Sequence, residues 1–158
     1  MNTFREFYND NKDRFFGYLL RRSGDHFLAA DTLQESFTKY LERYGKGELS
    51  VSLLFTIGRN LLNDNSRRQR PSIPFNEDEH RSEGDEESAF LVREESRRVL
   101  DALQQLDPDE IEVLSLAVNS GLSYKKIAEH TGTSESNIKV KIHRSRLKLK
   151  KILLASEL

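Results

Sequence analysis

Apolar side chains recur at intervals of three and four residues through most of this 158-residue chain. In residues 27–44, five of them fall on one helical face: Ala30, Leu33, Phe37, Leu41 and Tyr44. This spacing matches the 3.6-residue period of an α-helix, whereas a half-buried strand would alternate apolar and polar residues. No such alternation occurs in the sequence. We therefore expect an all-α protein.

A polar, acidic stretch divides the chain. Pro71 and Pro74 open it, and residues 71–88 consist mainly of Ser, Asn, Gly and carboxylates with few apolar side chains. Such a composition buries too little apolar surface to offset the entropy lost on ordering. The sequence therefore predicts two small helical domains, 1–70 and 89–158, joined by an acidic flexible linker.

Capping and turn residues set the expected helix boundaries. Ser50 can cap a helix, and Asp107 can cap another whose first position is Pro108. Gly58 is unfavourable inside a helix by about 1 kcal/mol relative to Ala, so we expect close packing there. Three helices are expected before the linker and four after it: one carrying Phe4 to Leu19, then 27–44, 51–69, 89–105, 108–118, 123–130 and 134–153.

The net charge of −1 conceals a strong asymmetry. Residues 1–75 carry 12 Lys or Arg against 9 Asp or Glu, while residues 76–100 carry 4 against 9. Within 134–151, seven basic residues face the single acid Glu135. Two basic-leaning parts thus flank an acidic middle, which favours an anionic partner for the outer parts.

Several classes of protein are disfavoured by what the sequence lacks. It has no cysteine, so disulfides and thiolate zinc sites are excluded, and a reducing compartment fits. It has no apolar run near the roughly 20 residues that span a bilayer, and no signal-peptide run at its start. We expect a soluble, cytoplasmic protein with no direct membrane insertion.

Catalysis and metal binding find little support in the sequence. The four histidines, which are scattered along the chain, are His26, His80, His130 and His143. They have no metal-ligand spacing, and no pair of carboxylates is spaced as an acid/base pair. The acidic run 77–87 has the composition of a solvated linker. We therefore expect no metal, no cofactor and no enzyme activity. The alternative that the chain is an enzyme acting on nucleic acid is rejected for the same reason.

Residues 121–134 carry the strongest local motif. Ser123 can cap a short helix, Gly132 permits a tight turn, and Ser134 can cap a longer helix. A short helix, a turn containing glycine and a longer helix form a helix-turn-helix, whose second helix can enter the major groove of DNA.

The second helix of this motif has two distinct faces. Ile138, Ile142, Ser145 and Leu149 would pack inward, while polar and basic residues point outward. The outward residues suit base edges and phosphates, although an ordinary amphipathic helix with a solvated basic face is the alternative. The residues that we predict to contact duplex DNA are Ser134, Glu135, Ser136, Lys139, Val140, His143, Arg144 and Arg146.

Together, three blocks of sequence resemble one protein family. Residues 102–146 resemble region 4 of the extracytoplasmic-function (group IV) sigma factors of bacterial RNA polymerase, in Gly121-Leu122-Ser123-Tyr124, Ile127-Ala128-Glu129 and Arg144-Ser145-Arg146. Residues 29–37 and 53–68 resemble the polymerase-binding and promoter-melting helices of the family's region 2. The chain departs from the family at Leu53-Leu54, where Trp-Leu is frequent, and at Gly58 and Ser145, where Ala is usual.

The resemblance implies roles for particular residues of the N-terminal domain. Asp31, Gln34 and Glu35 would bind the polymerase, although these side chains could instead only solvate a helix face. Phe37 is expected in the core. Arginine neutralises phosphates and asparagine reads base edges, while Phe55 could stack on a base or be packed. The residues that would hold the separated promoter strand are Lys46, Phe55, Thr56, Arg59, Asn60, Asn63, Arg67 and Arg68.

The implied function is that of an alternative sigma factor. Its partners would be core RNA polymerase, promoter DNA and an anti-sigma factor, and its two DNA-binding modules would be spaced by the polymerase. A stand-alone helix-turn-helix transcription regulator is the alternative, but it leaves the two N-terminal blocks without a purpose.

Overall fold

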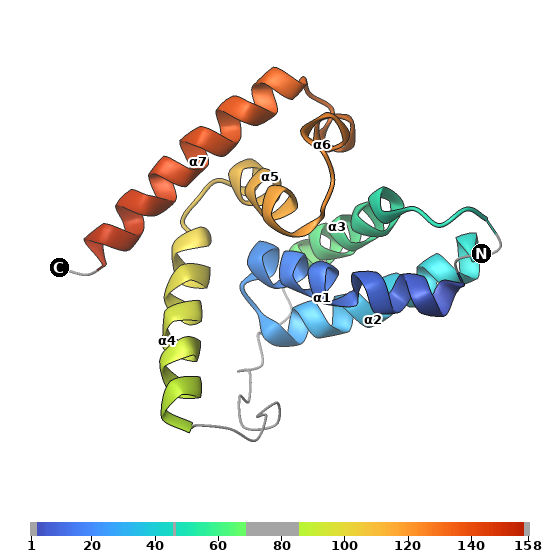
Figure 1. The fold of residues 1–158 in the computed structure, drawn as a ribbon, viewed down its shortest axis with the longest axis horizontal. Helices are drawn as coiled ribbons and strands as arrows, with labels where there is room; N and C mark the ends of the chain where they lie inside the picture. The colour runs from blue at the N-terminus through green and yellow to red at the C-terminus, as the bar shows by residue number, and fades with distance from the viewer. Residues whose placement is uncertain (1–2, 46, 69–85, 157–158) are drawn as a thin grey trace.

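A computed structural model describes residues 3–45, 47–68 and 86–156. Side chains are described for all of these except 66–68 and 86–93. The described residues form seven helices and no strand, which confirms the all-α prediction (Figure 1). The helices are α1 Phe4–Ser23, α2 His26–Tyr44, α3 Val51–Arg68, α4 Glu86–Leu103, α5 Pro108–Asn119, α6 Tyr124–Thr131 and α7 Glu135–Ala155.

The expected helix boundaries agree closely with the observed ones. The Ser50 hydroxyl accepts from the Leu53 amide at 3.2 Å, and Asp107 caps α5 with Pro108 at its first turn. Helix α4 begins at Glu86, three residues before the expected start, so it takes up the end of the predicted linker. The rest of that linker, 71–85, lies outside the described residues.

Aromatic side chains fill the core between α1, α2 and α3. Phe15, Tyr18, Tyr40 and Phe55 are fully buried there. At Gly58, a β-carbon would lie 2.6 Å from the Cζ atom of Phe15, so α3 approaches α1 as closely as the sequence predicts. This contact accounts for a glycine inside the helix.

Helix α5 is the centre of the C-terminal half. It packs on α6 and α7, and a small apolar cluster of Leu103, Leu106, Ile111 and Leu114 joins it to α4 and to the end of α7. Helix α7 extends from α6 toward the side of the molecule on which α4 lies (Figure 1). No helix of the described residues is long and apolar enough to cross a membrane.

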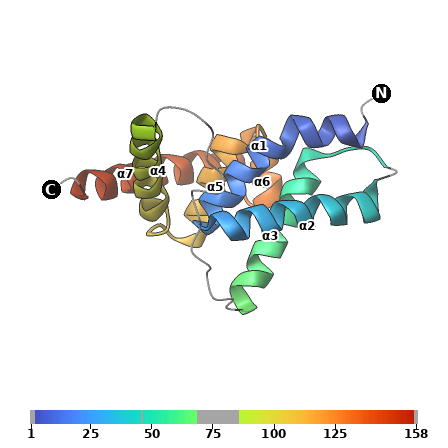
Figure 2. The same cartoon turned by 90° about the horizontal axis from the view of Figure 1, so that it is seen from below.

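The two halves of the chain pack against each other. Helix α5 lies on α1, and α6 lies on α3 (Figure 2). One cluster of buried side chains joins Tyr18 of α1 to Leu116 of α5 and Ile127 of α6. The sequence predicted two modules on a tether and did not predict this contact.

Candidate nucleic-acid and polymerase interface

Helices α6 and α7 form the predicted helix-turn-helix. The Ser123 hydroxyl accepts from the Lys126 amide at 3.2 Å, and the Ser134 hydroxyl accepts from the Asn137 amide at 3.1 Å. Between them, Gly132 is left-handed with φ 74°. Each of these local features agrees with the prediction for residues 121–134.

Helix α7 presents a basic, exposed face. Ile138, Ile142 and Ser145 are buried against α5 and α6, as predicted, while Leu149 is half-buried. All eight residues predicted to contact duplex DNA are exposed, from Ser134 to Arg146. The Ser134 hydroxyl is already engaged as a cap. The remaining seven form a solvent-facing row that can reach both phosphates and base edges.

Helix α2 divides its residues between the core and the surface. Phe37 is buried and packs edge-on to the ring of Tyr8, with centroids 4.7 Å apart, which confirms its expected place in the core. Asp31, Gln34 and Glu35 are exposed, and Glu35 lies 3.7 Å from the ammonium of Lys39. The structure thus leaves these three side chains accessible to a partner.

The residues predicted on α3 for single-stranded DNA do not share one environment. Asn60 and Asn63 are exposed, whereas Thr56 and Arg59 are half-buried under α6. The Arg59 guanidinium donates to the main-chain oxygen of His130 at 3.0 Å. Lys46 and the side chains of Arg67 and Arg68 lie outside the described residues.

The suggestion that Phe55 stacks on a DNA base is wrong for this structure. Its side chain is fully buried, with its ring centroid 5.1 Å from that of Phe15 and 4.9 Å from that of Tyr18. A stacking platform needs an exposed ring face. Phe55 is therefore a core residue, which was the alternative interpretation.

Sequence reasoning missed a buried ionic cluster between the two halves. Both carboxylate oxygens of Glu112, on α5, lie 2.7 Å from the Tyr18 hydroxyl, and one accepts from Nε of Arg22 at 2.6 Å. His130 Nε2 lies 3.7 Å from the same carboxylate. Glu112 is the sole charged residue in the apolar run 111–118, and this is the signal that could have pointed to it.

The ionisation of this cluster follows from its contacts. Burial by itself raises the pKa of Glu112, but His130, Tyr18 and Arg22 together outweigh it, so the pKa lies below its ordinary value of 4.5. Burial, followed by the charge and hydrogen bond of Glu112, raises the pKa of Tyr18 well above its ordinary 10.0. The cluster therefore holds a carboxylate and a neutral phenol near pH 7.

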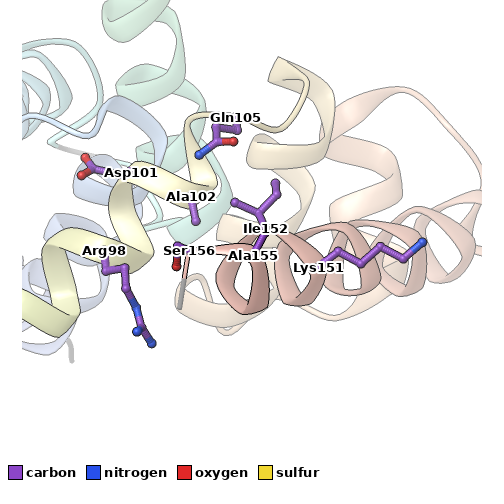
Figure 3. A pocket seen from close by; sticks show the side chains of 8 residues that line it. All are labelled: Arg98, Asp101, Ala102, Gln105, Lys151, Ile152, Ala155 and Ser156. Atoms are coloured by element: carbon purple, nitrogen blue, oxygen red, sulfur yellow. The ribbon is translucent and has the colours of Figure 1, made fainter. Parts of the chain in front are cut away.

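A groove of about 570 Å³ separates the end of α4 from the end of α7 (Figure 3). Its lining mixes charged and apolar side chains: Arg98, Asp101, Ala102, Gln105, Lys151, Ile152, Ala155 and Ser156. Among the described residues, no three His, Asp or Glu side chains gather as they would to hold a metal ion. The groove offers a surface for contact rather than a set of metal ligands.

Known proteins identify the family. Residues 96–149 match the family described as Sigma-70, region 4. Over 99% of its length the chain is 31% identical to the RNA polymerase sigma factor CarQ of Myxococcus xanthus, and it spans 92% of that protein. Over 86% of its length it is 30% identical to the ECF RNA polymerase sigma factor EcfG of Rhodopseudomonas palustris, spanning 77% of that protein. The chain belongs to the extracytoplasmic-function sigma factors.

The matched region of this sigma factor contains the helix-turn-helix, since 96–149 runs from α4 to α7. The fold is also that of a solved sigma factor. The structure of the sigma factor RpoE in complex with the anti-sigma factor NepR, from Bartonella quintana, matches with a TM-score of 0.70. The sequences are 21% identical, and the match covers 95% of this chain and 96% of that one.

Proposed function

We propose that this extracytoplasmic-function sigma factor uses its two halves for different parts of transcription initiation. Residues 1–70 would act as region 2, residues 89–158 as region 4, and 71–88 as the linker. The observation that carries this assignment is the exposed, basic face of α7 on a complete helix-turn-helix. As a sigma factor, the chain directs core RNA polymerase to promoters.

The exposed side of α2 would bind core polymerase. Asp31, Gln34 and Glu35 lie along one side of a helix whose other side is fixed in the core by Leu33 and Phe37. A rigid row of two carboxylates and an amide can meet a basic partner surface without first ordering a loop.

Duplex promoter DNA would meet α7. Glu135, Ser136, Lys139, Val140 and His143 lie toward its N-terminal end, which a helix-turn-helix presents to base edges. Arg144 and Arg146 follow and are suited to phosphates.

The separated promoter strand would meet α3. Asn60 and Asn63 are exposed there, and Thr56 and Arg59 share their side of the helix. We add Lys46, Arg67 and Arg68 to this strand-binding set because of the family resemblance. Arg59 would supply a positive charge to a phosphate once α6 no longer covers it.

An anti-sigma factor is the further partner that we propose. The solved sigma factor with the same fold was captured with such a protein. A sigma factor works where polymerase and DNA are, so we place this one in the cytoplasm. The polymerase would perform the chemistry, and this chain would not be an enzyme.

Core binding tests the role of α2. We expect Asp31→Ala with Glu35→Ala to weaken binding to sigma-free core polymerase by about tenfold or more, measured by biolayer interferometry. Asp10→Ala with Asp13→Ala is the matched control, since it removes two exposed carboxylates from α1 instead. Equal affinity for the wild type and the α2 variant would refute this role. If the wild type does not bind core polymerase, a stand-alone regulator becomes the better assignment.

A further inference from the structure

The contact between the two halves covers residues that the proposed function needs. We infer that Glu112 is a latch that holds the halves together, in what we call the closed arrangement, and that this arrangement competes with single-stranded promoter DNA for α3. The second part rests on the proposed role of α3 in binding the promoter strand.

The hydrogen-bond donors to Glu112 lie across the interface. The Tyr18 hydroxyl and the Arg22 guanidinium belong to α1, while Glu112 belongs to α5. From the C-terminal half, His130 approaches the carboxylate at 3.7 Å. Glu112 is 7% exposed, so water replaces these partners only when the halves separate. The hydrogen bonds of its carboxylate to α1 can therefore form only in the closed arrangement.

Removing the carboxylate would favour separation. In the closed arrangement, loss of Glu112 leaves the buried Tyr18 hydroxyl without its acceptor and leaves the half-buried Arg22 guanidinium with the Asn63 side-chain oxygen, at 3.3 Å, in place of an ion pair. A buried polar group without a partner is costly, and breaking a largely buried ion pair adds to that cost. In the open arrangement both side chains can bind water. The substitution therefore destabilises the closed arrangement and leaves the open one little changed.

The closed arrangement masks part of α3. The Arg59 guanidinium donates to the main-chain oxygen of His130, and Oγ1 of Thr56 lies 3.2 Å from Nδ1 of the same residue. An arginine that is half-buried under α6 and bonded to its main chain is poorly placed to bind a phosphate. A promoter strand that uses Arg59 would therefore compete with α6 for its guanidinium.

Further contacts between the two halves add to the stability of the closed arrangement. The Gln104 amide donates to the main-chain oxygen of Arg21 at 3.0 Å, and the Arg21 guanidinium donates to Asn119. Apolar packing of Tyr18 with the α5 and α6 side chains adds to them. The affinity for a ligand of the open arrangement is reduced in proportion to the fraction of open molecules. Weakening the latch should therefore raise that affinity.

The experiment measures opening and strand binding separately. The chain has no cysteine, so spin labels can be placed at Glu42→Cys on α2 and Lys150→Cys on α7, both exposed positions. We expect double electron–electron resonance to give one narrow distance distribution for the otherwise wild-type chain and a broader, longer one for Glu112→Ala. A wild-type distribution in Glu112→Ala would overturn the latch.

Two variants guard against a trivial effect on folding. Glu110→Ala removes the other buried carboxylate of α5, which pairs with Lys148 of α7 at 3.1 Å within the C-terminal half, and should keep the narrow distribution. Tyr18→Phe keeps the ring in the core but removes one donor, and should broaden the distribution less than Glu112→Ala does. Broadening in Glu110→Ala equal to that in Glu112→Ala would show general loosening and would also overturn the latch.

Strand binding is measured with fluorescein-labelled oligothymidine by fluorescence anisotropy. We expect Glu112→Ala to bind this probe about tenfold more tightly than the wild type, and Glu112→Ala with Arg59→Ala to lose that gain. An unchanged affinity, or a gain that survives Arg59→Ala, would refute competition for α3. Failure of the wild type to bind core polymerase would instead refute the proposed function and leave the distance result standing.

Discussion

Replacement of Phe55 separates its role in the core from a role in binding DNA. The ring is fully buried and lies close to the rings of Phe15 and Tyr18. Phe55→Leu keeps an apolar side chain but removes two aromatic pairs, each worth about 0.5–1.5 kcal/mol beyond the buried area. We therefore expect a loss of about 1–3 kcal/mol in the free energy of unfolding. Phe55→Ala should lose about 3–5 kcal/mol because it also leaves a cavity.

Urea denaturation followed by circular dichroism gives the free energy of unfolding, and oligothymidine anisotropy gives strand affinity. For Phe55→Leu we expect lower stability and strand affinity within about twofold of the wild type, because the ring has no exposed face. The core assignment would be refuted by unchanged stability together with strand affinity reduced about tenfold.

Three further predictions address the ionic cluster, the turn and the basic face. The pKa of Glu112 is lowered in the folded chain, so its carboxylate stabilises the fold above pH 4.5, the ordinary pKa value, and this contribution is lost as the pH falls below that value. The difference in unfolding free energy between wild type and Glu112→Gln, measured by urea titration, should therefore shrink as the pH is lowered from 5 to 3. A constant difference would contradict this prediction. Gly132→Ala should cost about 1–2 kcal/mol in thermal or urea unfolding because the position is left-handed, with no neighbouring atom within 4 Å to add a clash; full stability would argue against this backbone geometry. For binding to promoter duplex, Arg144→Ala should reduce the magnitude of the slope of log affinity against log salt concentration by about 0.9. An unchanged slope would show that Arg144 does not contact a phosphate.

Local signals in the sequence were sufficient for much of the secondary structure. Ser123, Gly132 and Ser134 specify the turn of the helix-turn-helix because capping and a left-handed glycine are decided within a few residues. The close approach at Gly58 could be predicted for a similar reason, since an unfavourable residue inside a helix needs a packing explanation.

Contacts between distant segments could not be predicted in this way. Tyr18 and Glu112 are 94 residues apart, and helical periodicity does not show which helix covers a given face. The same limit applied to Phe55, which lies at the edge of the apolar face of α3 and is buried because α1 covers it. The apolar face expected on α2 was only partly right: Leu33 and Phe37 are buried, but Ala30, Leu41 and Tyr44 are exposed. The exposed positions of Asp31 and Glu35 nevertheless agree with that expectation.

Run-off transcription tests the central claim most directly. The assay combines this protein with sigma-free core polymerase and a template carrying the upstream region of its own operon. We predict a defined transcript that requires the protein, and its loss on Asp31→Ala with Glu35→Ala or on Arg59→Ala with Asn60→Ala. A defined transcript made equally well by both double variants would contradict the assignment of polymerase binding to α2 and strand binding to α3.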